Sequence, residues 1–173
     1  MDTTAFGGWE SFYVLVGSAA SALTGLTFVV IALLRDVHRV QPQGVRSFVT
    51  PTIVHFSSVL LLAGFLTMPH AALAPVRWVI GAGGLLGAGY SLRVAFQLRS
   101  QTYQPVWEDW LWNAVVPTLA YAALAVLAAL LGSHARPAAY GIGVVCLTLL
   151  VAGIHNAWDL AVWTTLAQSR RES

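Results

Sequence analysis

Five long runs of apolar residues, separated by short segments that contain Pro, Gly and Arg, dominate this 173-residue sequence. The hydrocarbon core of a membrane is about 30 Å thick, and a helix crosses it with about 20 mostly apolar residues. Each of the five runs reaches that length, and the segments between them contain residues that break helices. We therefore expect an all-α membrane protein with five transmembrane helices, at about residues 11–34, 48–68, 76–98, 111–131 and 139–163.

The composition excludes several classes of protein. Only 9% of the residues are charged and 57% are hydrophobic, whereas soluble domains have about 25% charged residues. The basic residues are scattered and form no stripe with aromatic residues, so nucleic acid is not an expected partner. Cys146 is the one cysteine, which excludes a disulfide framework and a cysteine-based metal motif. No linker divides the chain, and we predict a single domain over residues 1–173.

The distribution of arginines predicts the orientation of the five helices. With five spans, most arginines fall on the side that holds the C-terminus, and only Arg77 and Arg136 fall on the other side. Loops on the cytoplasmic side carry the excess of basic residues. We therefore expect the N-terminus outside and the C-terminus in the cytoplasm. The arginines on the predicted cytoplasmic side are Arg35, Arg39, Arg46, Arg93, Arg99, Arg170 and Arg171.

Polar residues inside the predicted spans gather at one depth. His55 and His155 lie about seven and eight residues from the predicted cytoplasmic ends of their helices, which corresponds to about 10–12 Å. Asp159 is four residues after His155 and shares its helix face. An Asp at the membrane centre costs about 2.5–3.5 kcal/mol, so such residues usually mark function. The predicted intramembrane cluster comprises His55, Arg93, Asn113, His155, Asn156 and Asp159, and its cytoplasmic rim comprises Glu108, Asp109 and Trp110.

Each of these residues also has a structural explanation. His155 and Asp159 can form a hydrogen-bonded pair that stiffens one helix. The His55 ring can reach the carbonyl groups that Pro51 leaves without a donor. Arg93 can extend to the headgroups or pair with Asp159. The sequence leaves these alternatives open.

Two further features concern the fourth predicted helix. Glu108 and Asp109 stand where that helix begins, and their charges suit the positive end of a helix dipole. Asn113 precedes Pro117 by four residues. Because proline cannot donate to the Asn113 carbonyl, we expect a kink at this point.

Small residues repeat at intervals of four in two spans. Gly17, Ser21 and Gly25 share a face of the first span, and Gly83 and Gly87 share a face of the third. Such faces let helix backbones approach closely in lipid. The lipid bilayer is the expected environment, and a second copy of the chain is an expected partner through Gly17, Ser21 and Gly25.

Four segments together resemble a family of small bacterial integral membrane proteins without an assigned function. They are "WESFYVLVGSAASALTGLTFVVIAL", "PTIVHF", "YQPVWEDWLW" and "GIHNAWD", and they extend over nearly the whole chain. The resemblance implies a multi-pass protein of the bacterial inner membrane. It implies no activity or substrate.

The leading functional hypothesis is a structural or partner-binding membrane subunit, whose polar layer fixes the register of the helices. One alternative is a proton or ion pathway through the polar layer. Another is a zinc or other divalent metal site formed by His55, His155, Asp159 and Glu108, including a metal-dependent membrane hydrolase. A haem between His55 and His155 is the last alternative, against which the lack of a C-x-x-C-H motif counts. Whether the protein is an enzyme is left open.

Overall fold

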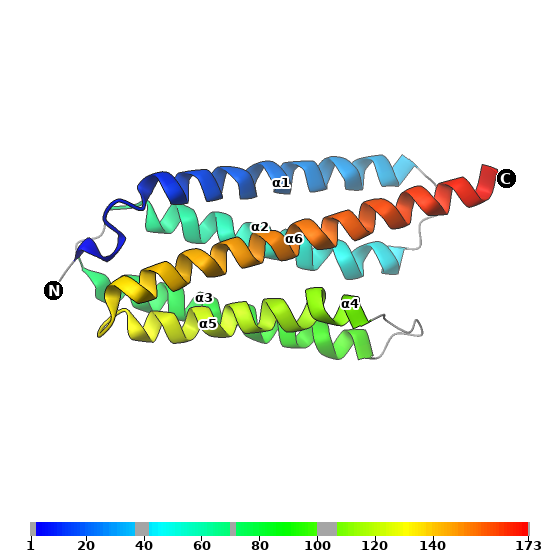
Figure 1. Cartoon of the computed structure of the whole chain (residues 1–173). Helices are drawn as coiled ribbons and strands as arrows, with labels where there is room; N and C mark the ends of the chain where they lie inside the picture. The colour runs from blue at the N-terminus through cyan, green and yellow to red at the C-terminus, as the bar shows by residue number, and fades with distance from the viewer. Residues whose placement is uncertain (1–2, 37–41, 70–71, 100–106, 173) are drawn as a thin grey trace.

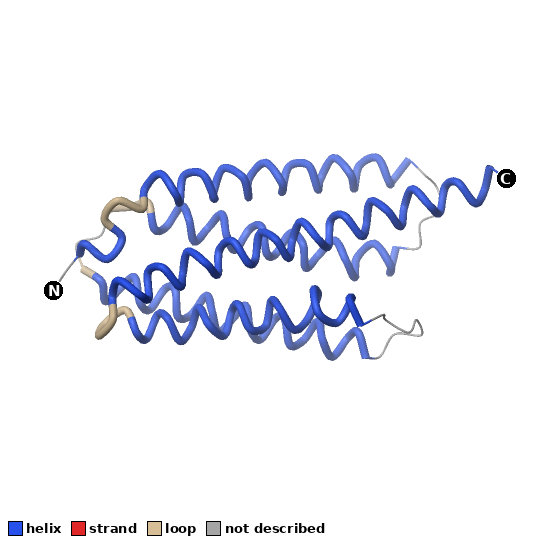
Figure 2. The backbone as a smooth tube through the Cα atoms, in the orientation of Figure 1, coloured by secondary structure: helices blue, strands red, loops and turns tan. Residues whose placement is uncertain are grey.

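The computed structural model describes residues 3–36, 42–69, 72–99 and 107–172, and these residues form helices joined by short turns (Figures 1 and 2). No strand occurs in this described part of the chain, which confirms the predicted all-α class. The elements are a 3₁₀ turn η1 (Thr3–Phe6), α1 (Glu10–Asp36), α2 (Pro42–Leu66), α3 (Leu73–Arg99), α4 (Trp107–Trp110), a π-helical turn η2 (Leu111–Val115), α5 (Val116–Leu130) and α6 (Ala135–Glu172).

Four helical segments are long and apolar enough to cross a membrane, judged by length and composition over the described residues. They are Glu10–Ala32, Leu73–Arg99, Leu111–Leu130 and Ala135–Asp159. A fifth segment, Thr50–Leu66 in α2, is apolar but shorter. The predicted run of five apolar helices is thus confirmed, with α2 contributing the shortest apolar stretch. The chain has the architecture of a multi-pass membrane protein.

The helix α6 lies in the middle of the bundle. It packs against α2 on one side and α5 on the other, while α1 packs on α2 and α3 packs on α5 (Figure 1). Successive long helices run in opposite directions, so the two termini lie at opposite ends of the bundle. We call the end that holds η1 the N-terminal end, and the opposite end the C-terminal end.

Glycines set the close approach of α3 to α5. A Cβ atom on Gly84 would lie 2.6 Å from the backbone nitrogen of Ala125, and one on Gly87 would lie 2.3 Å from the ring of Tyr121. Gly83, in contrast, has no atom within 4 Å of the corresponding position. The predicted Gly83–Gly87 pair is therefore wrong by one residue, because α3 is rotated so that Gly84 and Gly87 face α5.

The predicted Gly17, Ser21 and Gly25 stripe divides between two environments. Gly17 is buried, and a Cβ atom there would lie 3.1 Å from that of Ala63 in α2. Ser21 and Gly25 are exposed, and nothing lies within 4 Å of the Cβ position of Gly25. The stripe thus begins in a contact within the chain and continues on an open face of α1.

Pro117 shapes the start of the fourth span. The residues before it, Leu111–Val115, form a π-helical turn in which the N–H of Val116 donates to the carbonyl of Leu111. Proline has no N–H to donate, so the preceding turn cannot close in the regular α pattern. The disturbance expected between Asn113 and Pro117 therefore takes the form of a widened turn, a feature found frequently at functional sites.

Candidate functional site

A hydrogen-bonded group of three side chains crosses the interior between α2 and α5. Nδ1 of His55 lies 3.1 Å from the hydroxyl oxygen of Tyr121, and that hydroxyl donates to Oγ of Ser58 at 3.0 Å. Because α2 is a regular helix, His55 and Ser58 lie on the same face, one turn apart. His55 is 1% exposed and Tyr121 is equally buried. The histidine ring is therefore held by Tyr121, and its Nε2 has no hydrogen-bond partner among the described residues.

Two asparagine side chains are buried without hydrogen-bond partners. Asn113, in the π-helical turn, is 2% exposed, and Asn156, in α6, is 0% exposed. Both amide atoms of each lack a partner within the described structure, as does Oγ of buried Ser91 in α3. A buried polar group left unsatisfied costs about 1–3 kcal/mol. The described side chains of the interior thus leave several donors and acceptors to be satisfied by water or by a bound species.

The rings of Trp112 and His155 set the register between η2 and α6. The two rings stack at 4.5 Å between centroids and at 15° between planes. Asn113 follows Trp112 and Asn156 follows His155, so each buried asparagine is adjacent in sequence to one ring of the stack. The matched depth that the sequence predicts for His55 and His155 stays a prediction.

His155 and Asp159 form the expected pair on α6. Nδ1 of His155 lies 3.1 Å from Oδ2 of Asp159, and both side chains are partly exposed. The distance fits an ion pair, but this ring nitrogen has no hydrogen-bond partner among the described residues. The ring lies flat against Trp112 instead. This pair is therefore at the edge of the interior rather than within it.

Other predicted site residues lie away from the buried group. Arg93 is exposed on α3, and Glu108 is exposed on α4. Trp110 is half-buried and stacks under the guanidinium of Arg99, with 5.7 Å from that carbon to the ring centroid. The side chain of Asp109 is outside the described residues. The structure thus buries His55, Asn113 and Asn156 in the interior and leaves Arg93 and Glu108 on the surface.

The proposed metal ligands are not gathered. In the described parts of the chain, no group of three or more His, Cys, Asp or Glu side chains could hold a metal ion. His55 is deep in the interior, His155 is partly exposed beside Trp112, and Glu108 is on the outside of α4. The set of His55, His155, Asp159 and Glu108 is therefore not assembled as a metal centre.

Three buried or half-buried hydroxyl residues of the interior, Ser58, Ser91 and Tyr121, are not identified as site residues from the sequence. Tyr121 and Ser58 are hydroxyl residues within apolar runs, which makes them candidates for extending a relay without showing that they meet. Ser91 follows a glycine-rich segment, and its burial depends on how α3 is rotated against α5. The close approach at Gly84 and Gly87 is the cause of that rotation, and no residue pattern specifies it in advance.

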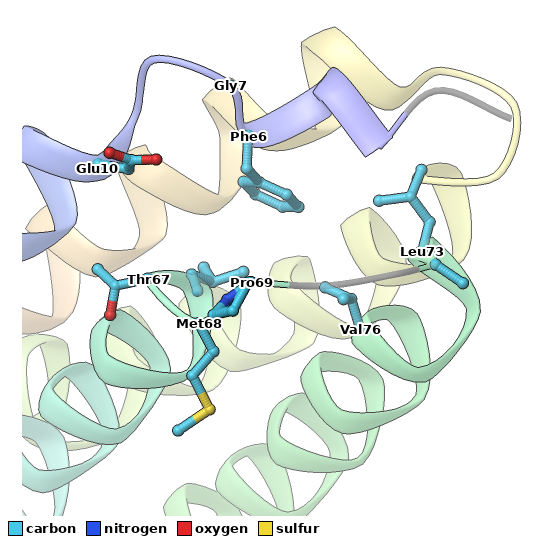
Figure 3. A pocket seen from close by; sticks show the side chains of 10 residues that line it. Phe6, Gly7, Glu10, Thr67, Met68, Pro69, Leu73 and Val76 are labelled. Carbon is cyan, nitrogen blue, oxygen red and sulfur yellow. The ribbon is translucent and has the colours of Figure 1, made fainter.

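A separate pocket of about 450 Å³ lies at the N-terminal end of the bundle. In Figure 3, the Phe6 ring extends toward the turn that carries Thr67, Met68 and Pro69, and Glu10 lies to one side. The lining is completed by Gly7, Leu66, Ala72, Leu73 and Val76. None of the predicted site residues lines this pocket, so it is distinct from the interior group around His55.

Comparison with protein-family models, with curated proteins and with solved structures finds no match to this chain.

Proposed function

We propose that this multi-pass membrane protein conducts protons, and that His55, Tyr121 and Ser58 form the proton relay. The supporting observation is the hydrogen-bonded series in which Tyr121 joins His55 to Ser58, while Nε2 of His55 has no partner among the described residues. A histidine ring has one nitrogen that donates and one that accepts, and a hydroxyl does both. A proton can therefore pass along the series by reversal of its hydrogen bonds.

A purely structural role explains this interior less well. Polar groups that fix helix register do so by bonding to one another, as His55, Tyr121 and Ser58 do. The amide groups of Asn113 and Asn156 instead lack partners in the described structure. Groups of this kind suit an interior that takes up water from the C-terminal end and hydrates the relay.

The opposite half of the interior forms the closed part of the proposed pathway. Beyond Ser58 toward the N-terminal end, the core consists of side chains such as Ala63, Leu124 and Ile142, around the hydroxyl of Tyr13. Narrow apolar segments of this kind control conduction by excluding water. We therefore propose a polar entrance followed by an apolar gate.

We further propose a location in the bacterial inner membrane, which the family resemblance supports, with the polar entrance on the cytoplasmic side, which the arginine distribution supports. Reporter fusions test this orientation. A reporter active only in the cytoplasm should function at the C-terminus and not at the N-terminus. The reverse result would place the entrance on the outer side and leave the relay itself unchanged.

Proton flux into liposomes tests the relay. Reconstituted protein should dissipate an imposed pH gradient faster than protein-free liposomes, and Tyr121→Phe should reduce the rate to that of protein-free liposomes. The matched control is Tyr140→Phe, which removes one hydroxyl from an exposed tyrosine that contacts Trp9 through its ring. The control should retain the wild-type rate. Equal rates for wild-type protein and protein-free liposomes would refute the proposal.

A second candidate function is that of a membrane subunit that binds a partner helix or a second copy of the chain. The open face of α1 supports it. Ser21 and Gly25 are exposed there, and the Cβ position of Gly25 is free of contacts within the chain. Small residues on an open face permit close packing of another transmembrane helix. Cross-linking in membranes should give dimers for wild-type protein and fewer for Gly25→Leu, while Gly83→Leu on α3 serves as the control.

A further inference from the structure

The π-helical turn at Leu111–Val115 leaves a backbone oxygen without its usual hydrogen bond beside the buried Asn113. In a regular α-helix, the carbonyls of Trp112 and Asn113 accept from the N–H groups of Val116 and residue 117. Here Val116 donates to Leu111, and residue 117 is a proline without an N–H. The Trp112 carbonyl therefore has neither its α-helical donor, Val116, nor a π-helical donor at residue 117, whereas the Asn113 carbonyl can still accept from residue 118.

Two buried side chains supply further oxygens without partners in the described residues. The amide oxygens of Asn113 and Asn156 have no hydrogen-bond partner in the described structure, and both side chains are at least 98% buried. The stacked rings of Trp112 and His155 hold the turn against α6, and each ring belongs to the residue that precedes an asparagine. The turn and α6 thus contribute three oxygens with unmet bonding capacity, on two elements that the Trp112–His155 stack holds in contact.

These oxygens are all uncharged. The described residues contain no cluster of carboxylates or histidines that could hold a metal ion, which disfavours divalent cations because they require charged oxygen ligands. Backbone and amide carbonyls are the ligands that replace the hydration shell of monovalent cations in membrane proteins. Interrupted helices supply such carbonyls to alkali cations near the membrane midplane.

From this arrangement we propose that the π-helical turn and Asn156 form a binding site for an alkali metal cation, with the carbonyl of Trp112 and the amide oxygens of Asn113 and Asn156 as ligands. The site does not include His55, Tyr121 or Ser58. It stands whether or not those residues relay protons.

Thermal unfolding of the purified full-length protein in detergent tests the site. The chain is compared in NaCl, KCl and choline chloride at equal ionic strength. A ligand that binds only the folded state raises the unfolding midpoint, and a filled site should raise it by about 5 °C over choline. Sodium and potassium are separate arms, and the larger shift identifies the preferred ion. Equal midpoints in all three salts overturn the proposal and leave the amides bound to water only.

Asn113→Leu and Asn156→Leu test the ligands. Each change removes a buried amide that has no hydrogen-bond partner in the described part of the chain, so the variant should unfold in choline at or above the wild-type midpoint. The shift in NaCl or KCl should be lost. The control Thr148→Val removes a hydroxyl that bonds to the Val144 carbonyl away from the interior, and its shift should persist.

The same variants separate this site from the proton relay. Tyr121→Phe should keep the cation-dependent shift even where it abolishes proton flux. A cation-dependent shift that persists in both asparagine variants shows binding elsewhere on the chain and overturns the assignment. If one asparagine variant does not fold, the other variant and the wild-type comparison of salts decide the outcome.

Discussion

The two halves of the bundle interior differ in kind. At the N-terminal end, apolar side chains such as Val76, Leu131 and Ile142 fill the core, and each is at most 1% exposed. At the C-terminal end, buried His55, Asn113 and Asn156 replace them, and several of their polar atoms lack partners in the described structure. Close packing stabilises the first half. In the second half, packing alone leaves polar groups unsatisfied, so this half is suited to holding water or a ligand.

We expect the largest loss of stability for a substitution in the apolar, N-terminal half of the interior. Ile142→Ala should lower the free energy of unfolding by about 2–5 kcal/mol, because a fully buried side chain is lost and a cavity remains. Val144→Ala, on an exposed face of the same helix, is the control and should change it little. Chemical denaturation in detergent measures both. Equal, small effects would show that the N-terminal half is not close-packed.

The next largest loss of stability is expected at the contact between Gly84 of α3 and Ala125 of α5. Gly84→Ala places a Cβ atom 2.6 Å from the backbone of Ala125, so α3 and α5 must separate. We expect a loss of about 1–3 kcal/mol in the free energy of unfolding.

The adjacent residue gives a matched control for this prediction. Gly83→Ala adds the same methyl group where nothing lies within 4 Å. Since alanine favours helix over glycine, this variant should be as stable as the wild type or more stable. If Gly83→Ala were instead less stable than Gly84→Ala, Gly83 would face α5, as the predicted Gly83–Gly87 pair requires.

The rotation of α3 about its axis could not be predicted from the sequence. The number of helices and their depth follow from the length of the apolar runs, because lipid requires helices of that length. Which residues face inward does not follow, since α3 is apolar and glycine-rich on all sides. Arg93 and Asn113 illustrate the difference: both belong to the predicted polar layer, but Arg93 is exposed and Asn113 is buried.

The hydrogen-bonded series is a second case of this limit. His55 precedes Ser58 by three residues, so their common face is predictable from α2 alone. Their link to Tyr121 spans more than 60 residues and depends on how α2 and α5 approach. The expected bond from His55 to a carbonyl near Pro51 is not formed by Nδ1, which is directed to Tyr121 instead.

A smaller effect is expected where α3 caps α5 at the N-terminal end. Arg77 donates from Nε to the carbonyl of Ala128 and from Nη2 to that of Ala129, both at 3.2 Å. These carbonyls end a helix and carry partial negative charge. Arg77→Gln should lower the free energy of unfolding by about 0.5–1.5 kcal/mol. Arg136→Gln, an exposed arginine at the start of α6, should have no measurable effect.

The smallest expected change in the free energy of unfolding is at Ser91, where it tests whether the interior beside this residue is dry or holds a bound partner. Its buried Oγ has no partner among the described residues, so Ser91→Ala removes an unmet polar group and adds no volume. In a dry interior, the free energy of unfolding should stay within about 1 kcal/mol of the wild type or rise. Ser18→Ala, on an exposed face of α1, provides the baseline. A loss beyond about 1 kcal/mol relative to Ser18→Ala shows that the hydroxyl has a bound partner, which extends the polar site from α2, η2 and α6 to α3.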